Sequence, residues 1–320
     1  DDNKIIDLIN DNNKNVLFDI SMMEYITKSF GAYFGTGISK RQGIVQDLNR
    51  DTMLGTLSHI RRLSYPLPGG SKSLGPRKLH NSQWGFVCPT DSPDGGNVGI
   101  INHLSIMARV STNISEDGIR ECLKDINVLF IKDIISDDFN DKAYIFLNGR
   151  LIGLYLNPAF LYKYLKLLKL NSIININTSI SWNIKSNEFH IFTDSGRIIR
   201  PVFYLKTNDK GDKYNELINK DYTYIETWKK AIHGLMYEEK KGNVSSADSE
   251  YYKEKLNEIK QKPDFMKYLE INAACIEYID SIESENAFIS KDIYSIDKNY
   301  SHSEIHSSLI LSALSVNIPF

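Results

Sequence analysis

The sequence predicts a multidomain α+β protein, and three observations support this. The chain has 320 residues, more than the roughly 250–300 at which a single hydrophobic core stops growing. Apolar side chains at helical spacing occupy residues 20–34, whereas residues 144–155 have the pattern of a β-hairpin. Between them, residues 74–107 are irregular and rich in glycine. We therefore expect an irregular region with helices, followed by small α+β domains.

Two helices are expected in the first part of the chain. The first covers residues 20–34, after which Gly35 and Gly37 end it. The second runs from about Ile44 to Arg62. Its expected inward-facing residues are Val45, Leu48, Leu54, Leu57 and Ile60. Prolines and glycines then predict a loop from Pro66 to about Gly75, residues 79–87 an irregular strand, and residues 98–110 a buried helix or strand.

The middle of the chain has clearer local signals. Asn148-Gly149 suits the type I′ turn of a hairpin, and Asn157-Pro158 provides the N-cap and first residue of a helix that continues through Leu168. Further strands are expected at 179–184, 188–192 and 197–205, and charged helical pieces separated by mobile loops at 206–300.

Composition limits the possible functions. The net charge of −2 gives the whole chain no preference for a polyanion. Residues 40–109, however, hold nine Lys or Arg against four Asp or Glu, whereas residues 236–300 hold nine Lys against fourteen acids. Three cysteines without a CxxC motif predict neither a disulfide framework nor a zinc ribbon. With no long apolar run and no leader, we expect an intracellular protein that does not span a membrane. The start at Asp1 and the stop at Phe320 suggest a fragment.

Residues 74–107 are the most informative stretch, and read LGPRKLHNSQWGFVCPTDSPDGGNVGIINHLSIM. The stretch combines basic Arg77 and Lys78, aromatic Trp84, and two acids three residues apart, Asp91 and Asp94. Ordering so many glycines costs backbone entropy. We therefore expect the backbone to pass close to another molecule, and the flanking positive charge suggests that this molecule is a polyanion.

The stretch and the residues before it resemble the fork region of the second-largest (β-type) subunit of multisubunit DNA-directed RNA polymerases. The matching residues are Leu57-Ser58-His59-Ile60-Arg61-Arg62, Arg77, Leu79-His80, Trp84-Gly85, Cys88-Pro89, Asp91-Ser92-Pro93-Asp94-Gly95 and Gly99. An ordered string of this length is far more specific than any one of its pieces. One departure is that both acidic positions are Glu in the family pattern and Asp here.

Other segments resemble the family in the same order. They are Lys28-Ser29-Phe30, Lys40 to Arg50, Asn148-Gly149-Arg150, Phe189 to Arg197 with Arg200-Pro201, Glu277-Tyr278-Ile279-Asp280, and Ser301 to His306 through Phe320. The resemblance implies five domains: the end of the protrusion (1–45), the fork (46–112), external 1 (113–205), external 2 (206–300) and the truncated start of the hybrid-binding domain (301–320). The Trp84 segment and the Ser301 block favour eukaryotic and archaeal versions, and the composition hints at a large DNA virus.

The resemblance also implies a function. The RNA 3′-hydroxyl attacks the α-phosphate of a nucleoside triphosphate, while Mg²⁺ is held by the partner large subunit and not by this chain. Partners would be the largest (β′-type) subunit, smaller polymerase subunits, template DNA and the RNA–DNA hybrid. This chain would position the hybrid, the incoming nucleotide and the downstream strands, and alone it would be inactive. The expected location is the nucleus, or the host cytoplasm or virion of a virus.

Basic residues are the main candidates for nucleic-acid contact, each with a plainer alternative. Lys72 lies in a glycine-rich segment that is either a surface loop or the second fork loop. Arg77, Lys78 and His80 either bind phosphates or form a solvated basic face, and His80 could instead hydrogen-bond the loop backbone. Further candidates are Lys40 and Arg41, matched to the first fork loop, and Arg61 and Arg62, which could equally satisfy the end of a helix.

The acids and the tryptophan also have alternatives. Asp91 before Ser92-Pro93 is expected to cap a turn through its own backbone, and Trp84 is expected in the core rather than stacked on a base. The resemblance places Asp94 near the incoming nucleotide, without a metal-binding role. His302, Glu304 and His306 alternate as zinc ligands could, but the family uses this stretch as structure, which argues against metal.

Two other classes of function remain open. The first is a non-catalytic nucleic-acid-binding scaffold built from the same domains. The second is a metal-dependent hydrolase that uses Asp91, Asp94, His80 and His103.

Overall fold

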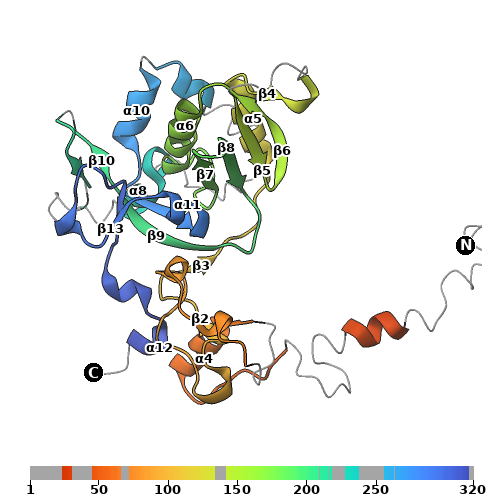
Figure 1. Cartoon of the computed structure of the whole chain (residues 1–320). Coiled ribbons are helices and arrows are strands. Elements are labelled where there is room, and N and C mark those ends of the chain that lie inside the picture. The colour runs from red at the N-terminus through yellow and green to blue at the C-terminus, as the bar shows by residue number, and fades with distance from the viewer. Residues whose placement is uncertain are drawn as a thin grey trace, which may run out of the picture. The chain divides into compact units, whose positions relative to one another are not determined.

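The computed structural model describes residues 24–30, 45–65, 72–133, 142–208, 210–215, 217, 228–237, 256–262 and 264–316 (Figure 1). The chain divides into two compact units, Asp1–Ile60 and Arg61–Phe320.

The first unit contains a helix at 24–30 and helix α4 (Met53–Ile60). The predicted helix at 20–34 is confirmed over 24–30, and its expected glycine end lies outside the described residues. The prediction of a helix from 44 to 62 is wrong in length, because residues 45–50 have no regular structure. Asn49 Oδ1 accepts from the Asp51 N–H and Thr52 Oγ1 from the Gly55 N–H. These local bonds compete with helix formation before Met53. The residues expected to face inward are exposed: Val45, Leu48, Leu54, Leu57 and Ile60.

The first sheet of the second unit has the strand order β4-β6-β5-β8-β7. Its strands are β4 (Leu129–Phe130), β5 (Ala143–Leu147), β6 (Arg150–Tyr155), β7 (Ser179–Asn183) and β8 (Glu188–Phe192). Strands β5 and β6 form the predicted hairpin, with positive φ at Asn148 and Gly149, and β5 pairs with β8 in parallel. The strands predicted at 179–184 and 188–192 are also confirmed.

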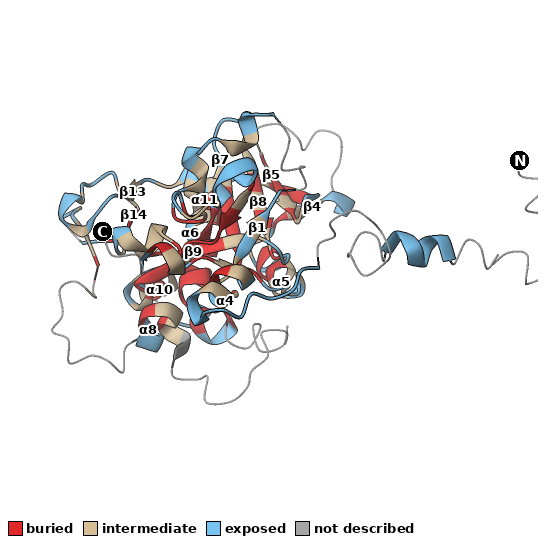
Figure 2. Cartoon of the chain, turned by 90° about the horizontal axis from the view of Figure 1, so that it is seen from below, coloured by how far each residue is buried: buried red, intermediate tan, exposed pale blue. Residues whose placement is uncertain are grey.

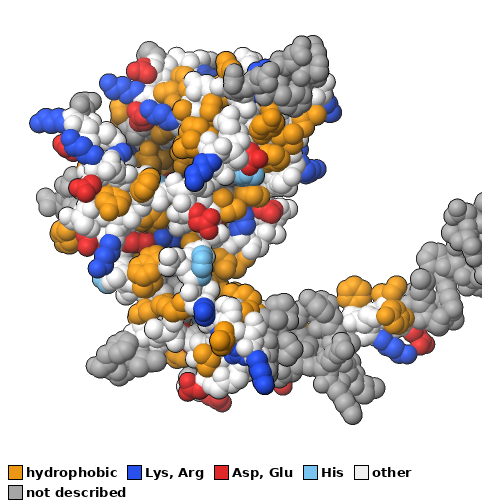
Figure 3. Space-filling view, in the orientation of Figure 1, with side chains coloured by type: hydrophobic (Ala, Val, Ile, Leu, Met, Phe, Trp, Pro, Cys, Tyr) orange, Lys and Arg blue, Asp and Glu red, His pale blue; other side chains and the backbone are white. Residues whose placement is uncertain are grey.

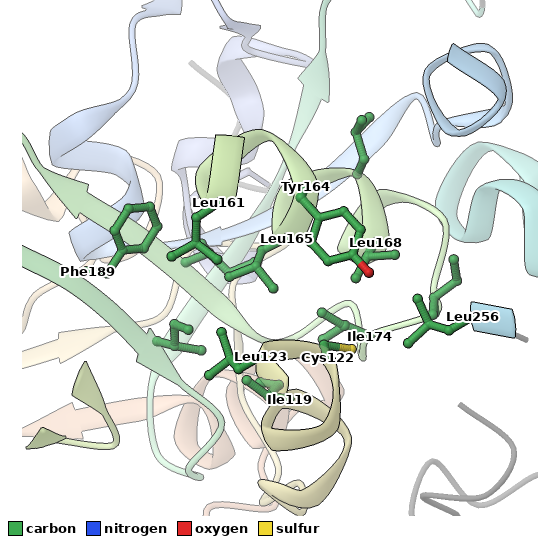
Figure 4. Packing of buried hydrophobic residues seen from close by; sticks show 14 of the residues in the cluster. Ile119, Cys122, Leu123, Leu161, Tyr164, Leu165, Leu168, Ile174, Phe189 and Leu256 are labelled. Atoms are coloured by element: carbon green, nitrogen blue, oxygen red, sulfur yellow. The ribbon is translucent and has the colours of Figure 1, made fainter. Parts of the chain in front are cut away.

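Helix α6 (Pro158–Leu170) packs against this sheet and carries much of the core. Asn157 caps it as predicted, accepting from the Phe160 N–H at 3.2 Å. Its leucines meet side chains of α5 (Asp117–Asp125) and of the sheet (Figure 4). The buried interior in Figure 2 includes α6, β8 and β9. Continuous burial of this kind is the main contribution to the stability of the unit.

A second sheet is centred on β9 (Ile198–Tyr204), which covers the strand predicted at 197–205. Its order is β12-β9-β14-β13, and β3 also pairs with β9. The partner strands are β3 (Arg109–Val110), β12 (Ile276–Asp280), β13 (Ile289–Ser290) and β14 (His302–Ser303). One strand therefore joins segments from the predicted fork, external 2 and hybrid-binding regions.

The ribbon at 72–108 is mostly irregular, as predicted. Strand β1 (Arg62–Ser64) pairs with β2 (Ile101–His103), so residues 98–110 contribute strands rather than a helix. The prediction of a strand at 79–87 is wrong. Residues Asn81–Gln83 form a 3-10 turn, and only Val87 makes an isolated bridge, to Leu104.

The remaining elements of the second unit are short. The helices are α8 (Trp228–His233), a helix at 256–260, α10 (Phe265–Asn272), α11 (Ser281–Asn286) and α12 (Ala313–Val316). The strands are β10 (Lys206–Thr207) and β11 (Lys213–Tyr214). Further 3-10 turns are Gly75–Arg77, Gly95–Asn97, Ile131–Asp133, Gly234–Tyr237, Ile293–Ser295 and Ser307–Ile310.

Candidate nucleic-acid interface

The two arms of the glycine-rich ribbon cross in direct contact. Gly99 has φ of +72°, and a Cβ there would lie 2.5 Å from the carbonyl oxygen of Arg77. Only glycine permits both this conformation and this approach. The Arg77 side chain then closes the crossing, because its Nη1 donates to the carbonyl oxygens of Gly96 at 2.8 Å and Val98 at 2.7 Å. Arg77 therefore holds the ribbon together, and part of its donor capacity is already used.

Three of the predicted cations are exposed and uncompensated. Arg62, Lys72 and Lys78 all lie on the surface. Within the described part of the chain, no carboxylate pairs with any of them. Figure 3 shows basic side chains reaching the surface near β2, beside hydrophobic ones. Because unpaired surface cations attract phosphates through long-range electrostatics, this surface can bind a polyanion.

Arg61 and His80 have structural partners instead. The Nη2 group of Arg61 donates to the carbonyl oxygens of Ser105 at 2.6 Å and Ala108 at 2.7 Å. His80 Nδ1 accepts from the Ser82 N–H at 3.2 Å and so caps its own turn. The backbone alternative for His80 is therefore confirmed for this nitrogen. The predicted contacts of Lys40 and Arg41 lie outside the described residues.

The two acids of the ribbon differ sharply. Asp94 is exposed at the start of the Gly95–Asn97 turn, without a side-chain cap, and no described cation pairs with it. The prediction that Asp91 caps its own turn is wrong. Its Oδ2 accepts from the Ser312 hydroxyl, and its Oδ1 lies 3.3 Å from His103 Nδ1. Of the four residues considered for a hydrolase, only Asp91 and His103 are brought into contact.

The prediction that Trp84 belongs to the core is also wrong. The residue is 51% exposed, and its Nε1 donates to Glu304 Oε1 at 3.2 Å. The other oxygen of Glu304 lies 2.7 Å from Arg200 Nη1. A Cβ on Gly85 would come within 2.7 Å of the Arg200 side chain. Gly85 therefore leaves the space in which Arg200 reaches Glu304.

The alternating residues His302, Glu304 and His306 serve separate structural roles. His302 Nε2 lies 2.9 Å from Glu277 Oε2, whereas His306 Nδ1 accepts from the Ser308 N–H. No group of three His, Cys, Asp or Glu side chains in the described ranges could hold a metal ion.

A buried ionic cluster that was not predicted from the sequence is formed by Lys166, Lys169, Glu277, Glu283 and His302. Their side chains are 10% exposed or less. Lys166 Nζ lies 2.5 Å from Glu277 Oε1 and 2.7 Å from Glu283 Oε1. Lys169 Nζ lies 2.8 Å from Glu283 Oε2. The available signal was the pair of lysines three apart within an otherwise leucine-rich helical pattern, because helical spacing puts them on one face.

Electrostatics keeps this cluster charged despite its burial. Burial opposes ionisation of Glu277, but Lys166, Lys169 and His302 outweigh it and hold the pKa of Glu277 well below its usual value. Burial likewise opposes the charged form of Lys166, but Glu277 and Glu283 raise the pKa of Lys166 well above its usual value. The cluster therefore ties α6 to β12 and α11 by charge, and β14 joins it through the contact between His302 and Glu277.

A cleft of about 400 Å³ lies between the Asn81–Gln83 turn and the β8–β9 turn. Phe86, Phe192, Arg197 and Ile282 are among its lining residues. None of the exposed cations described above lines it. No described helix has both the length and the apolar run needed to cross a bilayer.

Comparison with known proteins identifies the family. The model for RNA polymerase Rpb2, domain 3 matches residues 46–110, and the model for RNA polymerase Rpb2, domain 4 matches residues 145–206. DNA-directed RNA polymerase II subunit 2 of Arabidopsis thaliana is 31% identical over 291 residues, which cover 88% of this chain and 22% of the relative. The chain belongs to the RNA polymerase second-largest-subunit family. The ribbon with the exposed cations lies inside the region that matches Rpb2 domain 3.

Relatives of this Rpb2-family chain occur in archaea and a virus as well. DNA-directed RNA polymerase subunit Rpo2 of Sulfolobus acidocaldarius is 26% identical over 297 residues, covering 89% of this chain and 23% of the relative. DNA-directed RNA polymerase subunit 2 of Acanthamoeba polyphaga mimivirus is 28% identical over 291 residues, covering 89% and 23%. The chain thus spans less than a quarter of the length of these relatives.

Proposed function

We propose that this Rpb2-family chain is part of a DNA-directed RNA polymerase, where it positions the RNA–DNA hybrid, the incoming nucleotide and the downstream strands. The observation that carries the proposal is a basic surface of three exposed cations, Arg62, Lys72 and Lys78, inside the region that matches Rpb2 domain 3. No carboxylate of the described residues pairs with them. Such cations bind phosphates without regard to sequence. This suits a polymerase, which must hold any template.

The acidic turn, formed by Asp94 and the Gly95–Asn97 turn that follows it, supports a second part of the proposal. In this part, Asp94 lies near the incoming nucleotide. Its carboxylate is exposed, and no described side chain competes for it. It would act by orienting polar groups of the nucleotide, not by holding metal. The described residues do not fit a metal site of their own. The catalytic Mg²⁺ would belong to the largest subunit of the assembled enzyme, and we assign no step of the reaction to metal on this chain.

The remaining parts of the proposal concern the partners, the activity of the isolated chain and the location. They rest on membership in a multisubunit enzyme. The proposed partners are the largest subunit, smaller subunits, template DNA and nucleoside triphosphates. The isolated chain would be inactive, because the reaction would need groups of the largest subunit. The proposed location is the nucleus, or the host cytoplasm or virion for a viral enzyme.

The test is reconstitution of the complete polymerase with Lys72→Ala, Lys78→Ala or Arg62→Ala, followed by scaffold binding at several salt concentrations. Each substitution should weaken binding of all sequences alike, and the slope of log K against log salt should fall by about 0.7–0.9 per lost phosphate contact. A matched control is Lys185→Ala, at an exposed lysine in the β7–β8 turn, which should leave the slope unchanged. Unchanged slopes in the Arg62, Lys72 and Lys78 variants alike would show that this basic surface does not bind phosphates.

A further inference from the structure

The exposed acidic turn lies next to a buried network of hydrogen-bonded side chains. His103 and Asp91 have side chains only 5% and 9% exposed. His103 Nδ1 lies 2.9 Å from the Asp91 carbonyl oxygen and 3.3 Å from its Oδ1. Because both of these oxygens accept, Nδ1 carries the proton. His103 Nε2 then accepts from Arg62 Nε, 3.5 Å away.

At its other end, this hydrogen-bonded network includes Ser312, which is distant from Asp91 in the sequence. Asp91 Oδ2 accepts from the hydroxyl of Ser312, which lies just before α12. The Asp91 N–H is held as well, by Cys88 Sγ at 3.3 Å. Both carboxylate oxygens and the backbone of Asp91 are therefore engaged inside the protein. Asp91 cannot itself meet a ligand.

The base of the turn is fixed by the neighbouring serine. Ser92 Oγ donates to the Ile101 carbonyl oxygen at 2.9 Å and accepts from the Gly99 N–H at 2.9 Å. Asp94, which follows Ser92 in the same turn, makes no side-chain cap bond and has no ion-pair partner among the described residues. The place of its carboxylate is therefore set by the backbone that Asp91 and Ser92 hold.

We propose that His103, Asp91 and Ser312 are positioning residues that set the acidic turn, and that they link it to the exposed cation Arg62. This inference rests on the function proposed above, and it adds a coupling between the basic surface and Asp94. A phosphate that draws Arg62 away from His103 would alter the hydrogen bonding of Asp91. None of the three residues touches the substrate.

The test uses the complete reconstituted polymerase on a preformed scaffold, with rates normalised to assembled, scaffold-bound enzyme. His103→Phe removes both ring nitrogens, and we expect the KM for nucleoside triphosphate to rise by about tenfold, as for loss of a hydrogen bond to a charged group. His103→Asn keeps an amide donor toward Asp91 and should return KM to within about twofold of the parent. Ser312→Ala should also raise KM, whereas Ser308→Ala, whose hydroxyl contacts His306 instead, should not.

A double variant distinguishes a positioning role of His103 from a general effect on folding. Adding Asp94→Asn to His103→Phe should raise KM by less than the product of the single effects, because both act on one turn. Parent values of KM and kcat in assembled His103→Phe or Ser312→Ala enzyme would overturn the proposal. It would also be overturned if the only change were a smaller amount of assembled enzyme. If Asp94→Asn alone changes nothing while His103→Phe raises KM, the proposed role of Asp94 fails, but positioning of the rest of the turn stands.

Discussion

The Nζ atom of Lys166 lies 2.5 Å from Oε1 of Glu277, with both side chains almost wholly removed from solvent. The two residues come from α6 and β12, which are distant in sequence. Removing ions from water is expensive, and close geometry with further partners offsets that cost. Here Lys169, Glu283 and His302 complete the set of partners.

Lys166→Met should destabilise the chain strongly. It leaves Glu277 and Glu283 less compensated in the interior, and loss of one partner of a buried pair typically costs about 3–5 kcal/mol. Urea unfolding followed by tryptophan fluorescence measures the change. The matched control is Lys163→Met on the same helix, whose pair with Glu270 is exposed. That control should cost less than about 1 kcal/mol. Equal effects at both sites would contradict the assignment.

Stability should fall on the acid side because of Glu277. Its pKa is held well below the usual value in the folded chain, so its stabilisation is complete above the unfolded pKa, about 4.3. The stabilisation is then lost as the pH falls through the folded pKa. Unfolding free energies measured from neutral pH downward should show this loss, and Glu277→Gln should make the acid limb shallower. The exposed Glu285→Gln should leave the limb as in the parent. An unchanged limb in Glu277→Gln would show that another group dominates.

Gly85→Ala should destabilise the folded chain by more than the backbone strain of a positive φ would cost alone. A methyl group there meets the Arg200 side chain at 2.7 Å, and φ is +74°. Gly149→Ala is the control, since it has φ of +77° but open space around its Cβ. The control should cost about 1 kcal/mol from strain, and Gly85→Ala should exceed it by about 1–3 kcal/mol. Thermal or urea unfolding of both variants checks the difference, and equal costs would mean that Arg200 moves aside freely.

Trp84→Phe should have only a small effect on stability. The ring is about half exposed and contributes one hydrogen bond, to Glu304, so we expect a loss of about 0.5–1.5 kcal/mol. A tryptophan in the core would cost several times more when replaced by a smaller residue. Urea unfolding gives the value. A large loss would argue for the original core prediction.

The sequence was informative where the deciding interactions are local. The Asn148-Gly149 turn and the Asn157 cap were predictable because each is completed within a few residues. The helix at 44–62 was overextended because Asn49 and Thr52 hydrogen-bond their own backbone, which apolar periodicity does not reveal.

The failures at the site have a different physical origin. Local sequence predicts Trp84 in the core and Asp91 in a self-capped turn, but their partners Glu304 and Ser312 lie 220 and 221 residues away. No local pattern specifies such contacts. The exposed cations could be named from sequence, but whether a carboxylate of the described residues pairs with them could be seen only in the folded chain.

Strand β9 has a consequence for how this protein is made. It pairs with β3 from upstream and with β12 and β14, which end at Asp280 and Ser303. On the ribosome, one edge of β9 waits for β12, and the pairing with β14 on the other edge forms only after about a hundred further residues have been synthesised. Closure of this sheet is therefore a late, non-local event, and a nascent chain halted before β12 would present an unpaired edge to chaperones or to other chains.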